Sequence, residues 1–553
     1  MQRGGSSVGG RSLSARVVVQ RCALTAAFSS LLVVLGTVQA GDLPRPVGPA
    51  SAPAALTTAC RLPGVASAAR CGTLRRPLNP SQPGGVQIDI HFAVLPALAR
   101  HKAADPVFFL AGGPGQSAIS LAGVLASQHG RLGQRRDLVF VDQRGTGRSA
   151  PLRCADDAPR AGLRPLSEQA DTRQRSASLR SCRLALQALP YGDLRQFTTE
   201  QAMADVDAVR QALGVPRINL IAASYGTRAA LSLMRQFPAT VRRAVLDGVA
   251  PPDMGLQQTA ALDNQATLHA LFQACTVEPA CQQRYPQLRA QWQATLDRLP
   301  ASVTVPHPVS GQPQTLWLTP DAAMAWLRAP LYAPALAAAL PAALTQAFAG
   351  RWAALAALGS AAGGGEAGRI ATGLHLSVVC AEDLAPNRPE VSSSADPDIA
   401  PTTFPGAGPG DSLARFYREA CADWPRGSVS AAFFTLPPTS SPSWLISGGL
   451  DPVTPPRHGQ RVAAALGPLA RHIVVANAGH GVLGQACLRD AVARFIASDE
   501  ADASVLAMPA DCAQSVPRPL AFVPPGLRAD LPPSAASAPA ASPAASPAAS
   551  GPR

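Results

Sequence analysis

Residues 220–227 read Leu-Ile-Ala-Ala-Ser-Tyr-Gly-Thr, and this stretch decides the fold. The apolar run that ends at Ala222 is typical of a buried strand, and residues 227–237 have the pattern of a helix. Small residues flank Ser224, as they do where a sharp turn from strand to helix crowds the backbone. The stretch predicts a strand, a tight turn and a helix, with the Ser224 hydroxyl clear of the sheet as a nucleophile. An ordinary turn is the alternative, because Ser and Gly are common in turns.

Strands and helices alternate on both sides of this turn. Residues 86–94 alternate apolar and polar side chains, and the short apolar runs 107–110 and 138–141 lead into Gly-Gly-Pro-Gly and Asp-Gln-Arg-Gly. The pattern predicts a helix over residues 199–213 and another strand over residues 244–246. This alternation is typical of a mostly parallel sheet with helices on both faces.

The pattern changes between residues 251 and 438. Two long Ala-rich stretches there carry Leu, Trp and Phe at helical spacings, and strand-like runs almost vanish. Strand-like runs return at residues 444–447 and 473–475. We therefore predict an α/β core in two parts, residues 58–250 and 439–520, which is interrupted by a helical cap over residues 251–438.

The two ends of the chain differ from the rest. Residues 1–40 begin with scattered Arg, continue in an apolar run from Cys22 to Val38 and end in Val-Gln-Ala, the pattern of an export signal with its cleavage site. A membrane anchor is the alternative, although the run is shorter than the ~20 apolar residues that a span needs. Residues 41–57 are predicted to be a Pro/Ala-rich leader linker, and residues 532–553 a disordered Ala/Ser/Pro tail. We expect the mature protein in the periplasm or the extracellular medium, without a membrane span.

The chain carries a net charge of +13 from 48 basic and 35 acidic side chains. Such an excess ordinarily suggests nucleic acid or an acidic membrane as a partner. Lys102 is the only lysine, however, and the arginines form neither a run nor a basic helix face. Because Ala and Pro are also abundant, the excess of Arg can reflect a GC-rich genome, and we expect no nucleic-acid partner. A hydrophobic fraction of 47% excludes disorder throughout the chain.

Cysteine usage agrees with export. Of the 11 cysteines, Cys22 lies in the export signal, which leaves an even number. The others are neighbours along the chain, and five local disulfides are the natural prediction. The expected pairs are Cys60/Cys71, Cys154/Cys182, Cys275/Cys281, Cys380/Cys421 and Cys487/Cys512. Proximity alone suggests this pairing, so other connectivities stay open. The lack of C-x-x-C spacings argues against a structural zinc site.

A serine nucleophile needs a base, and the base needs an acid to orient it. Asp451 lies in a loop after the strand-like run 444–447, and His480 lies between two glycines in another loop that follows a strand. The order Ser, Asp, His along the chain is one in which such triads occur. An Asx-turn is the alternative for the aspartate, and a solvated loop position for the histidine. His375 and His458 are rival bases, but neither follows a strand between glycines.

Two backbone amides are predicted to stabilise the oxyanion of an acyl-transfer intermediate. One is the amide of Tyr225, at the start of the predicted helix. The other belongs to Gly112 or Gly113, because glycines after the strand at 107–110 let the backbone approach a substrate oxygen. A plain Gly-Pro turn is the structural alternative for this loop.

Taken together, the motifs resemble those of a known family. They are Gly-Gly-Pro-Gly at 112–115, Asp-Gln-Arg-Gly-Thr-Gly-Arg-Ser at 142–149, Ser-Tyr-Gly-Thr at 224–227, Gly-Leu-Asp-Pro-Val-Thr-Pro at 449–455 and Gly-His-Gly at 479–481. In this order, over roughly residues 85–515, the chain resembles the proline iminopeptidase / tripeptidyl aminopeptidase family of α/β-hydrolase serine peptidases. The resemblance implies an α/β-hydrolase fold with an inserted helical cap and a triad of Ser224, Asp451 and His480.

The resemblance also implies an exopeptidase that cleaves one residue or a short peptide from a free N-terminus, with no metal or organic cofactor. The expected export and disulfides look closer to the tripeptidyl branch. Two positions depart from the family pattern: Ala111 replaces the His of His-Gly-Gly-Pro-Gly, and Ala222 replaces the first Gly of the serine turn. Neither change removes a catalytic side chain, but the first puts in doubt any substrate contact of that histidine.

Four further polar residues have expected roles. An aminopeptidase must bind a cationic amine, which calls for carboxylates near the pocket. Glu382 and Asp383, in the cap, are the positions that the resemblance would use, and a solvated loop acid is the alternative.

We interpret the loop with Asp142 and Arg144 as mainly structural, with Arg144 holding it by charge-assisted hydrogen bonds. A direct contact with substrate is the alternative there.

The sequence thus predicts an exported serine exopeptidase that works through an acyl-enzyme on peptides with a free N-terminus. Two other functions stay open. A secreted carboxylesterase or amide hydrolase would use the same triad, because the fold does not determine the acyl donor. A binding protein that has lost catalysis would keep the fold without the reaction. The pattern does not specify the residue preference, the length of peptide released or the oligomeric state.

Overall fold

The computed structural model describes residues 56–158, 162–361, 369–389, 409–500 and 502–523. These residues belong to one compact unit, residues 55–553. The predicted export signal, almost all of the leader linker and the Ala/Ser/Pro tail lie outside the described residues.

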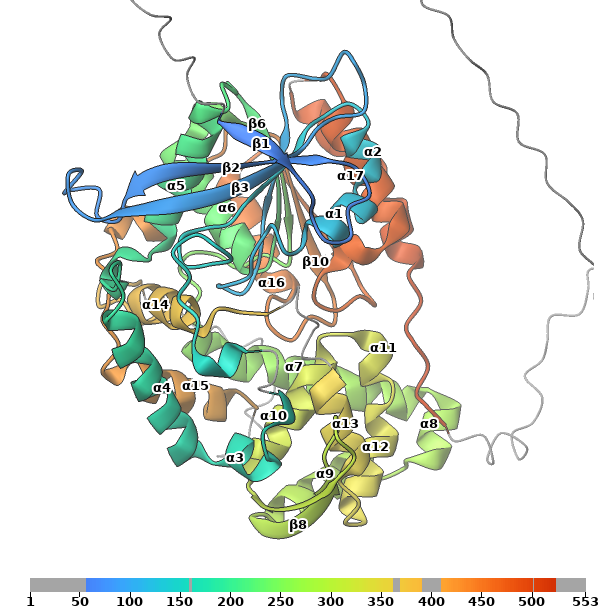
Figure 1. Ribbon diagram of the computed structural model, residues 1–553. Helices are drawn as coiled ribbons and strands as arrows, with labels where there is room; N and C mark the ends of the chain where they lie inside the picture. The colour runs from blue at the N-terminus through green and yellow to red at the C-terminus, as the bar shows by residue number, and fades with distance from the viewer. Residues whose placement is uncertain (1–55, 159–161, 362–368, 390–408, 501, 524–553) are drawn as a thin grey trace, which may run out of the picture. The chain divides into compact units, whose positions relative to one another are not determined.

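A nine-stranded sheet forms the centre of the described fold, in the order β1-β2-β3-β5-β4-β6-β7-β10-β11 (Figure 1). Its strands are β1 (Thr57–Cys60), β2 (Ala69–Pro77), β3 (Gln87–Leu95), β4 (Val107–Leu110), β5 (Leu138–Val141), β6 (Ile218–Ala223), β7 (Val241–Asp247), β10 (Ser443–Gly448) and β11 (Ala470–Val475). The pairings of β1, β2 and β3 are antiparallel, and every pairing from β5 to β11 is parallel. The predicted mostly parallel sheet is confirmed, and β1 and β2 extend it at one edge.

Helices cover both faces of the sheet and bury its central strands on both sides. β4 and β5 consist of apolar residues alone, and all of them are buried. One face packs against α5 (Thr199–Ala212), α6 (Tyr225–Gln236) and α16 (Pro456–Leu466). The other face packs against α1 (Ala122–Gln128), α2 (Gly130–Gly133) and α17 (Ala486–Ala497) (Figure 1).

The strands β7 and β10 are neighbours in the sheet, and the helices of the cap lie between them in the sequence. These helices are α7 (Leu256–Val277), α8 (Pro279–Arg284), α9 (Leu288–Asp297), α10 (Pro320–Leu331), α11 (Pro334–Ala337), α12 (Leu340–Phe348), α13 (Ala353–Ala361), α14 (Thr372–Glu382) and α15 (Pro409–Ala422). The same part of the chain also contains an antiparallel hairpin, β8 (Ala301–Pro306) and β9 (Pro313–Leu318), which lies between the two predicted helical stretches and was not predicted.

Two apolar cores share these helices. The cap has a core of its own, with Trp292, Leu327 and Leu344 among its fully buried residues. Leu166 of α3 (Leu166–Ala170) joins this core, although α3 and α4 (Thr172–Gln187) precede the serine turn in the sequence. Helix α14 packs instead on the core of the sheet, through residues such as Leu374.

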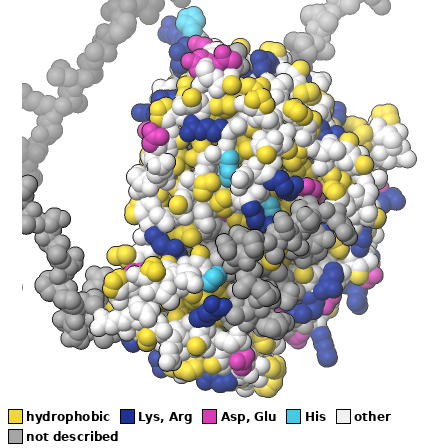
Figure 2. Space-filling view, turned by 180° about the vertical axis from the view of Figure 1, so that it is seen from behind, with side chains coloured by type: hydrophobic (Ala, Val, Ile, Leu, Met, Phe, Trp, Pro, Cys, Tyr) yellow, Lys and Arg dark blue, Asp and Glu magenta, His cyan; other side chains and the backbone are white. Residues whose placement is uncertain are grey.

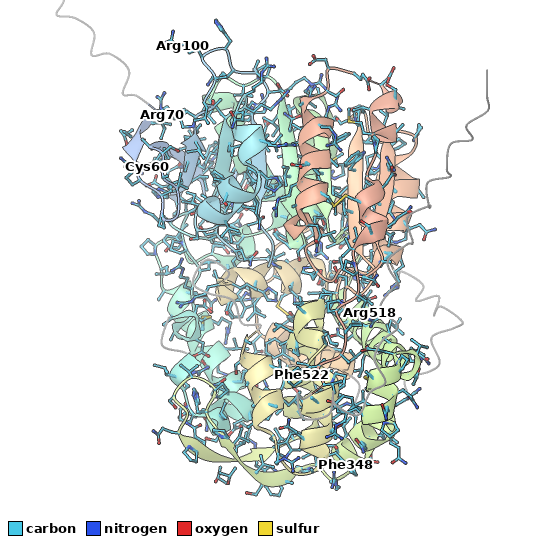
Figure 3. The ribbon with its side chains drawn as sticks, turned by 90° about the vertical axis from the view of Figure 1, so that its right-hand side faces the viewer. Cys60, Arg70, Arg100, Phe348, Arg518 and Phe522 are labelled. Carbon is cyan, nitrogen blue, oxygen red and sulfur yellow. A yellow bond between two sulfur atoms is a disulfide. The ribbon has the colours of Figure 1, made fainter. Side chains whose placement is uncertain are left out.

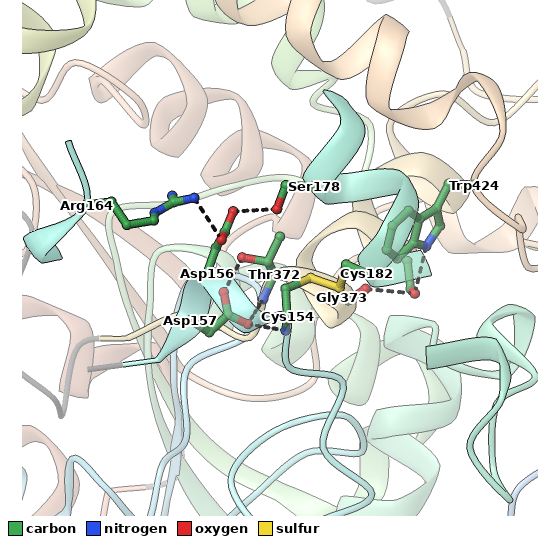
Figure 4. The surroundings of a disulfide bond; sticks show 10 residues. Cys154, Asp156, Asp157, Arg164, Ser178, Cys182, Thr372, Gly373 and Trp424 are labelled. Carbon is green, nitrogen blue, oxygen red and sulfur yellow. Dashed lines mark hydrogen bonds and ion pairs between the residues drawn. A yellow bond between two sulfur atoms is a disulfide. The ribbon is translucent and has the colours of Figure 1, made fainter. Parts of the chain in front are cut away.

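Five disulfides join the cysteines that neighbour each other in the sequence. They are Cys60–Cys71, Cys154–Cys182, Cys275–Cys281, Cys380–Cys421 and Cys487–Cys512. Cys154–Cys182 ties the loop after β5 to α4 (Figure 4). Beside it, Asp157 accepts hydrogen bonds from the backbone and the hydroxyl of Thr372, at 2.9 and 2.5 Å. The disulfide and this carboxylate together hold the loop, α4 and the start of α14.

Residues 516–523 connect the core to the cap near the C-terminal end of the described chain. The backbone N–H of Phe522 donates to the carbonyl of Ala338 (2.8 Å), and its carbonyl accepts from the hydroxyl of Tyr285 (2.9 Å). Arg518 donates to a carbonyl of α7 at 3.1 Å. Figure 3 shows Arg518 and Phe522 beside the helices of the cap. The segment therefore acts as a strap over the cap.

Two groups of ion pairs link α16 to the entry of the cap. The carboxylate of Asp263, which lies on α7 with a 1% exposed side chain, accepts from Arg457 at 2.9 and 2.6 Å. His458 Nε2 lies 3.2 Å from the other oxygen of Asp263. One turn further along α16, Arg461 pairs with Asp253. Because Asp263 is buried, its pairing is the one that stability should depend on.

On the face shown in Figure 2, Lys and Arg side chains are scattered among apolar and uncharged ones. No helix in the described part of the chain is long and apolar enough to cross a membrane.

Replacing Asp263 tests the link between cap and core. We expect Asp263→Ala to lower the free energy of unfolding by about 2–4 kcal/mol, because it leaves His458 and Arg457 without their buried partner. Urea unfolding followed by circular dichroism measures this difference. The exposed Asp297→Ala on α9 is the control, with an expected change within about 0.5 kcal/mol. Equal stability of both variants would show that the Asp263 cluster does not hold the cap.

Candidate active site

Ser224 lies at the turn between β6 and α6, with φ 56° and ψ −128°. A positive φ is costly for a residue with a side chain, by about 1–3 kcal/mol, so its surroundings must hold it. The Ser224 N–H donates to the carbonyl of Asp247 (2.8 Å), and the Ser224 carbonyl accepts from the hydroxyl of Thr227 (2.6 Å). A Cβ at Gly226 would lie 2.2 Å from the carbonyl oxygen of Leu110, so only glycine lets α6 approach β4 here.

His480 and Asp451 form a hydrogen-bonded pair in the loops that follow β11 and β10. Nδ1 of His480 lies 2.8 Å from Oδ2 of Asp451, whose side chain is fully buried. The other carboxylate oxygen accepts from the N–H groups of Val453 and Thr454, both at 2.9 Å, and the Thr454 hydroxyl donates to Oδ2 at 2.8 Å. Because a carboxylate only accepts, Nδ1 carries the proton, and Nε2 is left to act as a base.

The pairing controls the charge of both groups. Burial alone would raise the pKa of Asp451, but the positive charge of His480 and the surrounding donors outweigh burial and lower it. Burial alone would lower the pKa of His480, but the charge and hydrogen bond of Asp451 outweigh burial and raise it. The aspartate is therefore ionised while the imidazole stays able to exchange a proton.

Asp247, at the end of β7, connects the serine turn to the histidine loop. Its backbone carbonyl accepts from Ser224, and its buried carboxylate accepts from the N–H groups of Val482 and Leu483, both at 2.9 Å. Burial raises its pKa, and these two donors oppose the rise. The sequence analysis missed this residue. Its signal is an acid directly after a strand, the same signal that pointed to Asp451.

The glycine loop after β4 passes beside the serine. A Cβ at Gly112 would lie 3.1 Å from the Cβ of Ser224, so the loop and the serine are in direct contact. Gly113 has φ 111°, which favours glycine. The N–H of Ala371 donates to the carbonyl of Gly115 at 3.0 Å, which fixes the loop from the start of α14. The other predicted oxyanion donor is the amide of Tyr225, which directly follows Ser224 and is the first residue of α6.

The cap reaches the histidine through Tyr332, which follows α10. The N–H of His480 donates to the carbonyl of Tyr332 at 2.9 Å, and the two rings meet edge to face with centroids 5.3 Å apart. The rival bases have other partners. His375 contacts the carbonyl of Pro114 (3.2 Å) and the hydroxyl of Tyr417 (2.8 Å), and His458 belongs to the Asp263 cluster.

Glu382 and Asp383 lie at the end of α14 and are fully buried, so neither is a solvated loop acid. Arg228, four residues after Ser224, donates to Asp383 at 2.6 Å and lies 3.5 Å from Glu382. The N–H of Thr199 donates to Glu382 at 2.7 Å. Burial raises the pKa of Glu382 to about 7, and Arg228 opposes the rise. The binding of a substrate amine by these residues stays a prediction.

Asp142 and Arg144 have partners within the protein. Asp142 accepts from the hydroxyl of Ser117 at 2.6 Å and from the N–H of Ile119 at 3.1 Å. Arg144 is 1% exposed and binds both oxygens of Asp205, at 2.7 and 3.0 Å. It also donates to the carbonyls of residues 78 and 196. These contacts fasten the loop after β5 to α5.

In the described ranges no three His, Cys, Asp or Glu side chains lie together as a possible metal site.

Comparison with known proteins gives two family matches, to the alpha/beta hydrolase fold over residues 105–298 and to "TAP-like protein" over residues 411–507. Serine protease Hip1 of Mycobacterium tuberculosis is 30% identical over 203 residues, 35% of this chain and 38% of the relative. Tripeptidyl aminopeptidase of Streptomyces coelicolor is 30% identical over 192 residues, 33% of this chain and 35% of the relative. Carboxylesterase B of Mycobacterium tuberculosis is 27% identical over 226 residues, 38% of this chain and 43% of the relative.

These alignments thus span less than half the length of each relative. Among solved structures, the proline iminopeptidase of Mycobacterium smegmatis gives a TM-score of 0.35 at 16% identity, over 77% of this chain and 97% of that one. The sheet order and the first match give this chain the α/β-hydrolase fold, and residues 411–507 are similar to TAP-like proteins.

Proposed function

We propose that this chain is a serine exopeptidase that hydrolyses amide bonds near the free N-terminus of peptides. The observation that carries the proposal is the 2.8 Å pair between His480 Nδ1 and Asp451 Oδ2, on the same sheet edge as a serine held at φ 56°. Relatives named as a tripeptidyl aminopeptidase and a serine protease support peptides as the substrate class. In this proposal Ser224 is the nucleophile, His480 the general base and Asp451 its orienting acid.

The reaction is an acyl transfer in two steps. Nε2 of His480 takes the proton of the Ser224 hydroxyl while Oγ attacks the scissile carbonyl, and the amides of Tyr225 and of Gly112 or Gly113 bind the resulting oxyanion. When the intermediate collapses, the C–N bond breaks, and the leaving amine takes the proton from His480. Water then attacks the acyl-enzyme with the same histidine as base, which releases the acid and restores the serine.

We propose that Glu382 and Asp383 attract the substrate amine. Glu382 is linked to the serine turn, because Thr199 donates to it while the Thr199 hydroxyl meets the Tyr225 hydroxyl at 2.8 Å. With a pKa of about 7, Glu382 is only partly ionised near neutral pH, and a bound ammonium group would favour its charged form.

Export is part of the proposal too, since the five disulfides are typical of oxidising compartments.

A carboxylesterase is the second candidate, because one relative carries that name and would use the same triad. Paired substrates separate the two functions. We expect Pro-, Ala- and Ala-Ala-Pro-type amides with free N-termini to be hydrolysed, and the same amides to be resistant once acetylated. Turnover should fall at least 10³-fold in Ser224→Ala. Hydrolysis of a short acyl ester alone, indifferent to the amine, would identify an esterase instead.

The pH dependence tests the His480–Asp451 pair. The base must be neutral, so kcat/KM should fall as the pH drops through the pKa of His480, which Asp451 raises. Asp451→Asn removes that charge while burial remains, so the acidic limb should move to lower pH, and kcat should fall by about 10³–10⁴-fold. The exposed Asp297→Asn should change neither. An acidic limb that stays in place in Asp451→Asn would contradict this assignment.

Glu382→Gln tests the amine site. We expect a higher KM for peptides with a free amine and unchanged turnover of a simple ester, because only the former bring a cation to this carboxylate. Steady-state kinetics on both substrate types, with circular dichroism to verify folding, give the comparison. An equal loss on both would show that Glu382 supports the fold and not the amine.

A further inference from the structure

A cavity of about 630 Å³ lies between α3, α4, α10 and α15, and none of the predicted catalytic residues lines it. Its lining includes Arg175 from α4, Arg328 from α10 and Arg415 from α15. Asp321 and Glu419 are the acids among its lining residues. Arginines therefore outnumber acids in this cavity.

The three arginines are not equally engaged. Arg415 forms an ion pair with Asp321. The guanidinium of Arg175 lies 5.4 Å from the ring centre of Phe416, as in a cation–π contact. Arg328 makes no hydrogen bond or ion pair with any residue that the structure describes, although it is half-buried. Its guanidinium lines the cavity without a protein acceptor, so an anion that enters the cavity can accept its hydrogen bonds.

Arg175 and Arg328 also repel each other. Partial burial lowers the pKa of Arg175, and the nearby positive charge of Arg328 lowers it further, while Asp321 and Glu419 act in the opposite direction. Two like charges at the wall of one cavity are stabilised by an anion between them. Guanidinium groups bind carboxylates with two parallel hydrogen bonds, which makes a carboxylate the best match.

Arg328 also lies close to the candidate active site. Arg328 and Tyr332 are four residues apart along α10 and its C-cap, so they share one face of the helix. The charge of Arg328 reaches Tyr332, since it opposes the rise of the tyrosine's pKa that burial causes. The Tyr332 ring is 5.3 Å from that of His480, and Arg328 lies one helical turn before Tyr332.

We propose that Arg328, assisted by Arg175, binds a carboxylate of the peptide substrate. The proposal rests on the proposed peptidase function and specifies its substrate class. The carboxylate comes either from the C-terminus of a short peptide or from an acidic side chain. A short peptide acid would be held between the catalytic residues and this cavity, which would favour small peptides over longer ones.

The test uses two pairs of free-amine peptides with the same scissile bond. One pair differs in a C-terminal acid or amide, and the other, amidated throughout, differs in Glu or Gln at the corresponding position. In the wild-type protein we expect one of the two pairs to show a preference. The peptide with the carboxylate should have a kcat/KM about tenfold higher than its neutral partner, mainly because its KM is lower. Arg328→Gln should remove this preference without changing the rate on neutral peptides, and Arg328→Lys should restore it in part. Arg351→Gln, which removes an exposed charge of the cap, should keep it.

The outcomes separate the two proposals. Equal kcat/KM for charged and neutral peptides, or a preference that survives in Arg328→Gln, would overturn the carboxylate site while the peptidase function stands. A preference in the acid/amide pair assigns the site to the C-terminus, and one in the Glu/Gln pair to a side chain. If no peptide of either pair is hydrolysed, the peptidase function fails, and the carboxylate site fails with it.

Discussion

The serine turn is the constraint on which the site depends. A residue with a side chain at φ 56° is strained, and the fold compensates with a hydrogen bond from the Ser224 N–H to the carbonyl of Asp247 and with the close approach of Gly226 to β4. Both contacts exist only because β6 lies between β4 and β7 in a parallel sheet. The same sheet edge carries Asp451 and His480, so the order of the strands assembles the candidate triad from three distant parts of the sequence.

Asp247 connects the serine turn to the histidine loop. Through its carbonyl it holds the turn of Ser224, and through its carboxylate it holds the loop that follows His480. A single buried acid thus holds both the candidate nucleophile and the loop of the candidate base. Such positioning matters because a displacement of about 1 Å between reacting groups is enough to cost most of the rate.

The cap contributes more than a cover. Tyr332 contacts His480 from the cap side, and Asp383 pairs with Arg228 of the core helix that starts at the serine turn. Buried ion pairs of this kind add little net stability, but breaking one leaves an uncompensated charge. These pairs therefore fix the position of the cap relative to the serine. They also fix the distance from the candidate triad to the arginines of the cavity between α3, α4, α10 and α15.

Three features could be predicted from the sequence: the strand, turn and helix around Ser224, the mostly parallel sheet and the neighbouring cysteine pairs. These features depend on local periodicity, turn chemistry and proximity along the chain, which are visible in short windows. Only the tertiary structure decided the role of Asp247, the pairing of Arg228 with the two acids of α14, and the packing of α14 on the core of the sheet. The partner of a buried charge is set by residues that are far away in the sequence, and a local pattern carries no information about them. The sequence analysis also did not predict β1, β2 and the β8–β9 hairpin. β1 has only four residues and β2 is rich in polar ones, so neither carries a clear apolar period. β8 does alternate apolar and polar residues, a strand signal that the prediction of a helical cap overlooked.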